Sequence, residues 1–376
     1  MKATTKIKVL QGIRQGKIGG GESYLLGLVE QLDKSRFEPV VLSFTDGPMV
    51  DRLRGWGVAT HVIYTEKPFD FSVWGKVSRL LREEGIDLVH AHGTRAMSNM
   101  FRPAVRSGLP LVYTCHGWSF HRGQHPLVRK VRMVSEKYLT QKASVNICGA
   151  RASRDEAREC FGRFDAEIIY NSIDYQRFNP EGQYKDVRRE LGIPADALVV
   201  ASIARFTHQK QPLLLVEAFA RMAQKVPHAL LLMVGDGELK EETLQLIEKL
   251  GIADRVVQQS FRTDVPDVLA AADIFVLPSL WEVFPIALLE AMAMGKAVIA
   301  TGVDGTAEMV QHGQNGLLLD LNHLLPDLEA ALLELGTNEA RRKQLGANAL
   351  ASVANKYRID ELARKNEQIY QRLAAR

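Results

Sequence analysis

Residues 273–301 read DIFVLPSLWEVFPIALLEAMAMGKAVIAT, and this stretch decides the fold. Two short apolar runs within it, 273–278 and 296–301, predict strands. Between them, residues 285–294 predict a helix, with Pro285 in the first turn, where its missing N–H is not needed. Two consecutive strands joined by a helix normally lie parallel in one sheet. The stretch therefore predicts a β-α-β unit of an α/β fold.

The same alternation of short apolar runs and helical periodicity extends along the whole chain of 376 residues. In the second half it predicts further strands at 198–204, 229–235 and 255–260, and helices at 212–224, 239–250 and 265–272. In the first half it predicts strands at 7–13, 40–44, 87–92, 110–116, 144–148 and 167–170, and a helix at 22–32. This pattern is typical of two doubly wound, Rossmann-like domains with parallel sheets. Their expected bounds are 1–178 and 179–355, followed by a C-terminal helix at 356–376.

The charge distribution restricts the class of partner. Lys and Arg number 27 against 18 Asp and Glu in residues 1–178, which gives +9, whereas 21 against 26 in residues 179–376 gives −5; together they give the net +4. A basic domain indicates an anionic partner, which can be a phospholipid surface, a nucleic acid or a phosphorylated substrate. Nucleic acid is the least favoured, because neither a recognised binding module nor an array of stacking aromatic side chains accompanies the charge.

Cysteine content and hydropathy exclude further classes. Cys115, Cys148 and Cys160 include no CxxC pair, which argues against a disulfide framework and against a zinc site. The first residues lack the apolar core of a signal peptide, and no apolar stretch approaches the ~18 residues of a membrane span. We therefore expect a cytoplasmic protein.

Candidate binding residues of the second domain follow two predicted strands, at the sheet edge where ligands of parallel sheets bind. After the strand at 273–278, the amides of Ile286, Ala287 and Leu288 begin a helix and suit a diphosphate. Glu282 and Glu290 flank these amides, and carboxylates at such a place suit the hydroxyl groups of a sugar and a ribose.

Two cations follow the strand at 198–204. Arg205 and Lys210 can neutralise a leaving nucleoside diphosphate without a metal ion. Taken alone, each of these sets is also compatible with ordinary surface side chains.

The first domain offers a glycine cluster and several histidines. The cluster, GKIGGGE at 16–22, allows backbone amides to approach a phosphate, but it matches neither GxGxxG nor a P-loop. His116 ends the strand at 110–116, where it can act as a base or as a hydrogen-bond donor to phosphate or sugar. His90 and His92 flank Ala91, and we expect them on opposite faces of their strand, which argues against a shared metal.

Residues 121–142 predict a basic amphipathic helix. Its cations are Arg122, Arg129, Lys130, Arg132, Lys137 and Lys142, and its apolar residues at helical spacing are Leu127, Val131, Val134, Tyr138 and Leu139. Such a helix either packs its apolar face on the core or rests on an anionic membrane surface. Both interpretations stay open from the sequence.

Together these motifs resemble glycosyltransferase family 4, the retaining enzymes of the GT-B fold, over nearly the whole chain. The matching segments are Gly19-Gly20-Gly21-Glu22, His92, His116-Gly117, Asn171-Ser172-Ile173-Asp174 with Phe178, Arg205 with Lys210, Glu282 with Glu290, Gly295-Lys296, and Gly305 with Glu308. The pair of glutamates separated by seven residues is the most specific of them. Gln211 and Val283 stand where the family usually has glycine, and Val283 is expected to alter donor choice.

The resemblance implies a set of site residues and an interdomain cleft that holds the donor. The implied catalytic residues are His116, Arg205, Lys210 and Glu282, and the implied donor-binding residues are Gly20, Arg205, Lys210, Glu282, Phe284, Ile286, Ala287 and Glu290. In the family, the glycine amide and the two cations hold the diphosphate, the second glutamate holds the ribose, and the histidine lies beside the reacting sugar. The C-terminal helix crosses back to the first domain, and neither a metal nor a cofactor is required.

The expected function is retaining transfer of a hexose or N-acetylhexosamine from a nucleotide diphosphate sugar, with a UDP-sugar favoured. The expected acceptor is a glycan or a lipid-linked acceptor in cell-envelope polysaccharide or lipopolysaccharide synthesis, reached from the inner face of the plasma membrane. Two alternatives stay open. One is a catalytically silent subunit that binds a sugar nucleotide, and the other is a different GT-B enzyme, such as a sugar-nucleotide epimerase or an inverting transferase.

Overall fold

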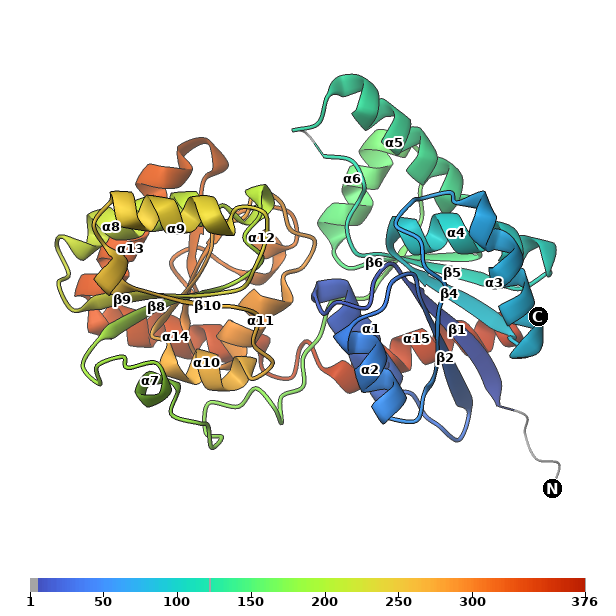
Figure 1. The fold of residues 1–376 in the computed structure, drawn as a ribbon, viewed down its shortest axis with the longest axis horizontal. Helices are drawn as coiled ribbons and strands as arrows, with labels where there is room; N and C mark the ends of the chain where they lie inside the picture. Colours follow the sequence, from blue (N-terminus) through green and yellow to red (C-terminus); the bar gives the residue numbers. More distant parts are fainter. Residues whose placement is uncertain (1–5, 122, 376) are drawn as a thin grey trace. The chain divides into compact units, whose positions relative to one another are not determined.

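The structure, a computed structural model, describes residues 6–121 and 123–375. The chain divides into two compact units: residues up to Ser172 together with the segment from Ile359, and residues Ile173–Arg358. Each unit contains one parallel β-sheet flanked by helices (Figure 1). The first division lies six residues before the predicted one, because Ile173 pairs with Arg358 and the buried Phe178 packs within the second unit.

The first unit has a seven-stranded sheet with the order β3-β2-β1-β4-β5-β6-β7. Its strands are β1 Ile7–Ile13, β2 Phe37–Ser43, β3 Ala59–Val62, β4 Leu88–His92, β5 Leu111–Cys115, β6 Val145–Cys148 and β7 Glu167–Ile168. Its helices are α1 Gly20–Gln31, α2 Pro48–Gly55, α3 Phe71–Glu83, α4 Gly93–Arg106, α5 Pro126–Thr140, α6 Arg151–Phe161 and the C-terminal α15 Ile359–Ala374. Helix α15 packs against α1, so the end of the chain belongs to the first unit.

The second unit has a six-stranded sheet with the order β10-β9-β8-β11-β12-β13. Its strands are β8 Leu198–Ile203, β9 Ala229–Val234, β10 Val256–Gln259, β11 Ile274–Leu277, β12 Ala297–Thr301 and β13 Leu317–Leu319. Its α-helices are α7 Val187–Glu190, α8 Pro212–Ala223, α9 Lys240–Lys249, α10 Val265–Ala271, α11 Ile286–Ala293, α12 Thr306–Met309, α13 Leu324–Thr337 and α14 Glu339–Val353. Short 3-10 turns occur at His208–Lys210, Ala253–Arg255 and Leu321–His323.

Alternate residues of the central strands build a core on each face of each sheet. In β1, Val9 contributes to the cluster formed with α1 and α15, whereas Leu10 contributes to the cluster formed with α3 and α4. In β8, Val200 packs toward α8, α9 and α13, and Val199 toward α10 (Figure 1). Burial on both faces explains why the strands read as continuous apolar runs in the sequence.

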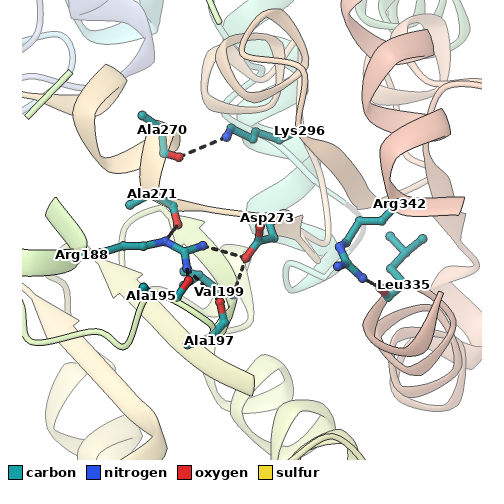
Figure 2. A network of polar contacts seen from close by, with 10 residues as sticks. All are labelled: Arg188, Ala195, Ala197, Val199, Ala270, Ala271, Asp273, Lys296, Leu335 and Arg342. Carbon is teal, nitrogen blue, oxygen red and sulfur yellow. Dashed lines mark hydrogen bonds and ion pairs between the residues drawn. The ribbon is translucent and has the colours of Figure 1, made fainter. Parts of the chain in front are cut away.

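A polar network joins the amino-terminal ends of β8 and β11 (Figure 2). Arg188 donates to Ala271 O, Ala195 O and Ala197 O and pairs with Asp273 at 2.9 Å. The same carboxylate oxygen accepts from Val199 N at 2.8 Å. The network therefore holds together the starts of two neighbouring strands whose other ends carry the candidate site.

Candidate active site

The strand order of the second unit reverses between β8 and β11, and the loops after these two strands are bonded to each other. Leu280 N donates to Gln209 O at 2.8 Å, and Gln209 Nε2 donates to Trp281 O at 2.7 Å. Such a switch point is where open α/β sheets bind ligands.

Lys210 and Glu282 form an ion pair at this switch point. Only 16% of the lysine side chain and 10% of the glutamate side chain are exposed, so the pair is poorly screened by water. Glu282 N donates to Asp304 Oδ2 at 3.0 Å, which ties the loop after β12 to the same place. The residue after Lys210, Gln211, is left-handed with φ 52° and ψ 51°. This is the conformation that glycine adopts most readily, and glycine is the usual family residue there.

The loop after β11 ends at the start of α11. Pro285 is the residue before the first helical position rather than the first, and Leu289 N donates the first helical bond to its carbonyl at 3.1 Å. The amides of Ile286, Ala287 and Leu288 precede that bond at the positive end of the helix. The ring of Phe284 is buried against Tyr357, with ring centroids 5.1 Å apart, which leaves only its backbone for a ligand.

Glu290 lies one turn inside α11 and is half-buried. Loss of hydration raises its pKa from 4.5 to about 8, and the charge of Arg177 opposes this only in part. At neutral pH the carboxyl group is therefore mostly protonated and can both donate and accept a hydrogen bond. Arg205, two residues after the end of β8, is exposed, and in the described residues its side chain has no ion-pair partner.

In the first unit, the strand order reverses between β1 and β4, and His92 is the last residue of β4. His116 follows the adjacent β5, and its Nε2 lies 3.1 Å from His92 Nδ1. Gly20 and Gly21 begin α1; a Cβ on Gly21 would lie 3.3 Å from the ring of His116, whereas Gly20 is exposed with open space around it. The structure thus brings His116 and the glycine cluster together in the first unit, and Lys210, Glu282 and the start of α11 together in the second.

The expectation that His90 and His92 lie on opposite faces of their strand is wrong. Their rings are 4.1 Å apart between centroids, because residues two apart on a strand point to the same face. His90 contacts Tyr370 Oη at 2.6 Å and Thr114 Oγ1 at 2.7 Å, and His92 contacts Gln11 Oε1 at 2.8 Å. Sequence reasoning missed Gln11 and Tyr370; the available signal was a glutamine inside the apolar run at 7–13.

The basic helix is α5, and four of its five predicted apolar residues are exposed rather than in the core. Leu127, Val131, Val134 and Tyr138 are 66%, 61%, 63% and 43% exposed, and we call these four the α5 ridge. Leu139 is buried, as core packing predicts. Arg122 lies outside the described residues.

Two further features complete the description. A cavity of about 560 Å³ lies between the end of α5 and the β6–β7 edge, with Arg163 and Arg372 in its lining, and it contains none of the predicted site residues. None of the helices in the described part of the chain combines the length and the hydropathy that a membrane span requires.

Comparison with known proteins identifies the family. The family model described as Glycosyltransferase Family 4 matches residues 18–177, and that described as Glycosyl transferases group 1 matches residues 183–351. The UDP-Gal:alpha-D-GlcNAc-diphosphoundecaprenol alpha-1,3-galactosyltransferase of Escherichia coli is 26% identical over 98% of each chain. The N-acetyl-alpha-D-glucosaminyl L-malate synthase of Bacillus anthracis is 27% identical over 83% of this chain and 82% of its own.

A solved structure agrees over the whole fold. Anabaena HepE in complex with UDP and glucose has a TM-score of 0.86 and 25% identity, and the match covers 97% of this chain and all of that one. The family and the fold expected from the sequence are confirmed. The chain belongs to glycosyltransferase family 4 and is a glycosyltransferase of the GT-B fold.

Proposed function

We propose that the chain transfers a hexose or N-acetylhexosamine from a nucleotide diphosphate sugar, with UDP-sugars favoured, to a glycan or lipid-linked acceptor of cell-envelope polysaccharide or lipopolysaccharide. The observation that carries this proposal is the Lys210–Glu282 pair, which lies with the start of α11 at the switch point of the second sheet. The relatives support it, because the Escherichia coli enzyme is named for a UDP-galactose donor and a diphosphoundecaprenol-linked acceptor. The Anabaena structure contains UDP and glucose.

The donor would be held through its charged and hydroxyl groups. An ammonium has three hydrogen-bond donors, so Lys210 can hold Glu282 and still contact diphosphate oxygens. Arg205 and the amides of Ile286 and Ala287 would add positive charge on the same diphosphate. Glu282 would bind hexose hydroxyls and Glu290 the ribose hydroxyls, while Gly20 and His116 would contribute from the first unit.

The reaction would proceed with retention of configuration and without a metal ion. The bond from the anomeric carbon to the diphosphate oxygen breaks, and the acceptor oxygen forms its bond to that carbon on the same face. The acceptor proton passes to the departing diphosphate oxygen. Negative charge develops on the diphosphate, which is where Arg205, Lys210 and the helix amides would stabilise it. We assign no covalent nucleophile, because Glu282 pairs with Lys210 and would bind the hexose hydroxyls.

Turnover of the proposed donor tests this assignment. Lys210→Ala and Glu290→Ala should each lower turnover a hundredfold or more, on the order of ~3 kcal/mol. Lys343→Ala is the matched control, because it removes a lysine that pairs with Glu339 on the exposed surface of α14, outside the proposed site. Wild-type turnover by Lys210→Ala would contradict the proposal. Thermal shifts with a panel of nucleotide sugars identify the donor.

Two further measurements separate the alternatives. The anomeric configuration of the product, read by NMR, distinguishes retention from inversion, and epimerised donor would indicate an epimerase. A silent binding subunit would bind the donor but neither transfer nor hydrolyse it. Undiminished transfer in the presence of a chelator is expected, and loss of transfer would contradict the metal-independent mechanism.

We also propose that the protein contacts an anionic membrane at the inner face of the plasma membrane through α5. The α5 ridge residues are spaced four, three and four positions apart, so they share one side of the helix, and that side is exposed. Lys130, Arg132 and Lys137 are exposed on the same helix, and its one acidic residue, Glu136, is buried. An exposed apolar stripe flanked by cations suits an interface of anionic lipids.

Flotation with vesicles tests this contact. Wild-type protein should float with vesicles that contain anionic lipid and remain unbound with neutral ones. The double variant Val131→Ser/Val134→Ser should lose flotation, whereas Leu250→Ser, which removes an exposed leucine of the second unit, should not. Equal binding to both kinds of vesicle, or binding to neither, would exclude the membrane contact. It would also be excluded if the wild-type protein formed a dimer in solution and the double variant did not.

A further inference from the structure

A chain of hydrogen bonds crosses the interior of the first unit and ends at His116. Its links are Thr114 Oγ1 to His90 Nε2 at 2.7 Å, His90 Nδ1 to Tyr370 Oη at 2.6 Å, Tyr370 Oη to Gln11 Nε2 at 2.9 Å, Gln11 Oε1 to His92 Nε2 at 2.8 Å, and His92 Nδ1 to His116 Nε2 at 3.1 Å. The glutamine, the tyrosine and the two strand histidines are fully or almost fully buried. Water is therefore excluded from these groups, and their partners must come from the protein.

The orientation of the Gln11 amide determines which group donates and which accepts in each hydrogen bond of this chain. Its Nε2 donates to the hydroxyl of Tyr370, so its Oε1 faces His92. An amide oxygen can only accept, which requires a proton on His92 Nε2. In this order the tyrosine hydroxyl donates to His90 Nδ1, so each group within the chain both donates and accepts.

The same order of donors and acceptors extends to His116, which donates to His92. Burial keeps the pKa of His92 well below its ordinary value, so the ring is neutral and carries one proton. That proton is on Nε2, which leaves Nδ1 as an acceptor for His116 Nε2–H. Burial, together with the nearby charge of Arg14, lowers the pKa of His116 to about 4. His116 therefore has a proton on Nε2 and a lone pair on Nδ1.

We propose that Gln11 and Tyr370 are positioning residues that fix His116 as the Nε2–H tautomer, so that Nδ1 meets the ligand as a hydrogen-bond acceptor. Tyr24 contacts the ring edge-on with centroids 4.9 Å apart, and Gly21 lies against it on α1, so the ring is also held in place. The group that His116 recognises must then be a donor, such as a sugar hydroxyl. A phosphate oxygen cannot donate a hydrogen bond, so it is excluded as the partner of Nδ1. The sequence left two roles open for His116, a base or a hydrogen-bond donor to phosphate or sugar, and only the role of acceptor remains. The identity of the ligand rests on the proposed function, but the tautomer does not.

The tautomer of His116 can be read directly in the full-length protein. Long-range ¹H–¹⁵N correlation spectra of ¹⁵N-histidine-labelled protein separate a protonated ring nitrogen from a bare one, and His116→Asn assigns the signals. Wild-type protein should show a bare Nδ1 and a protonated Nε2. Gln11→Met removes the acceptor for His92 and should leave His116 as a mixture of tautomers. Gln11→Glu keeps an acceptor there and should preserve the wild-type pattern.

Two tyrosine variants complete the test. Tyr370→Phe removes the anchor of Gln11 Nε2 and should shift His116 in the same direction as Gln11→Met. Tyr113→Phe is the matched control, because this buried hydroxyl bonds to Glu136 outside the chain, and it should leave the spectrum of His116 unchanged. A proton on Nδ1 of His116 in the wild type would overturn the proposal, and so would an unaltered tautomer in Gln11→Met.

Activity separates this proposal from the proposed function. Gln11→Met should lower kcat/KM by about tenfold, equivalent to one neutral hydrogen bond, and Gln11→Glu should recover part of it. Wild-type protein that shows the Nε2–H tautomer but turns over no nucleotide sugar would contradict the function and leave the tautomer assignment intact.

Discussion

The raised pKa of Glu290 predicts that the second unit loses stability as pH rises through neutrality. Folding raises this pKa from 4.5 to about 8, mainly because the half-buried carboxyl group loses hydration. Between these two values the folded protein holds a proton that the unfolded chain has released. The free energy of unfolding therefore falls as pH rises, by about 1.4 kcal/mol for each pH unit.

Between pH 5 and pH 7 this amounts to about 2–3 kcal/mol. Glu290→Gln cannot ionise, so its free energy of unfolding should fall less over the same interval, and it should be the more stable protein at pH 7. All other titrating groups are shared by the two proteins, so their contributions cancel in the comparison. Below pH 4.5 both states of the wild type are protonated and the pH-dependent difference vanishes.

Urea unfolding at pH 5, 6 and 7 measures this difference. The second unit contains only Trp281 of the four tryptophans, so ¹⁹F NMR of fluorotryptophan-labelled protein follows it separately from the first unit. Trp281→Phe assigns its signal. If the stability difference between the two proteins changes by less than about 0.5 kcal/mol between pH 5 and pH 7, burial does not hold the proton on Glu290.

Substitutions at three further positions, Gly346, Gln211 and Arg188, test the packing that positions the site. Gly346→Ala should destabilise the second unit by about 2 kcal/mol in urea, although alanine favours a helix, because its Cβ would overlap the carbonyl oxygen of Gly295; Gly75→Ala, on an open helix face, should instead stabilise the first unit by about 0.5–1 kcal/mol. Gln211→Gly should change stability by less than about 1 kcal/mol, whereas Gln211→Val should cost about 2 kcal/mol, since a β-branched residue tolerates the left-handed conformation poorly. Arg188→Met should lower the urea midpoint of the second unit by the equivalent of about 2–4 kcal/mol, and full stability of this variant would show that the network in Figure 2 is not required.

The strands and the second-unit site could be predicted because each depends on local sequence and one topological rule. Most of the buried parallel strands are mainly apolar, so most of the predicted bounds agree with the structure within one residue. The edge strands β3 and β13 are exceptions, because they were not predicted. Lys210 and Glu282 are 72 positions apart, but each follows a strand that neighbours the other in the sheet. Parallel strands bring such loops to one edge, which is why the two residues could be placed together without coordinates.

The exposed side of α5 and the buried hydrogen-bond chain could not be predicted, because they depend on tertiary contacts that leave no periodic pattern in the sequence. The spacing of the α5 ridge gives a helix, but it does not say whether the apolar side faces the core, and α5 packs through Leu139 and Glu136 instead. The buried chain that ends at His116 joins β1 to α15, and Gln11 and Tyr370 are 359 positions apart. Only the return of the last helix to the first unit brings them together.

Burial of Glu290 also bears on how the second unit would hold a diphosphate. Near the ends of β8, β11 and β12 it provides two cations, Arg205 and Lys210, and two carboxylates: Glu282, paired with the lysine, and Asp304, which accepts from Glu282 N. With Glu290 protonated, the charges of Arg205, Lys210, Glu282 and Asp304 cancel, and ionisation of Glu290 would make the net charge negative. The proton that the loss of hydration keeps on Glu290 at neutral pH thus avoids a further negative charge beside the site proposed for the nucleoside diphosphate. A carboxylic acid at this position can therefore bind hydroxyl groups without repelling the phosphates beside them.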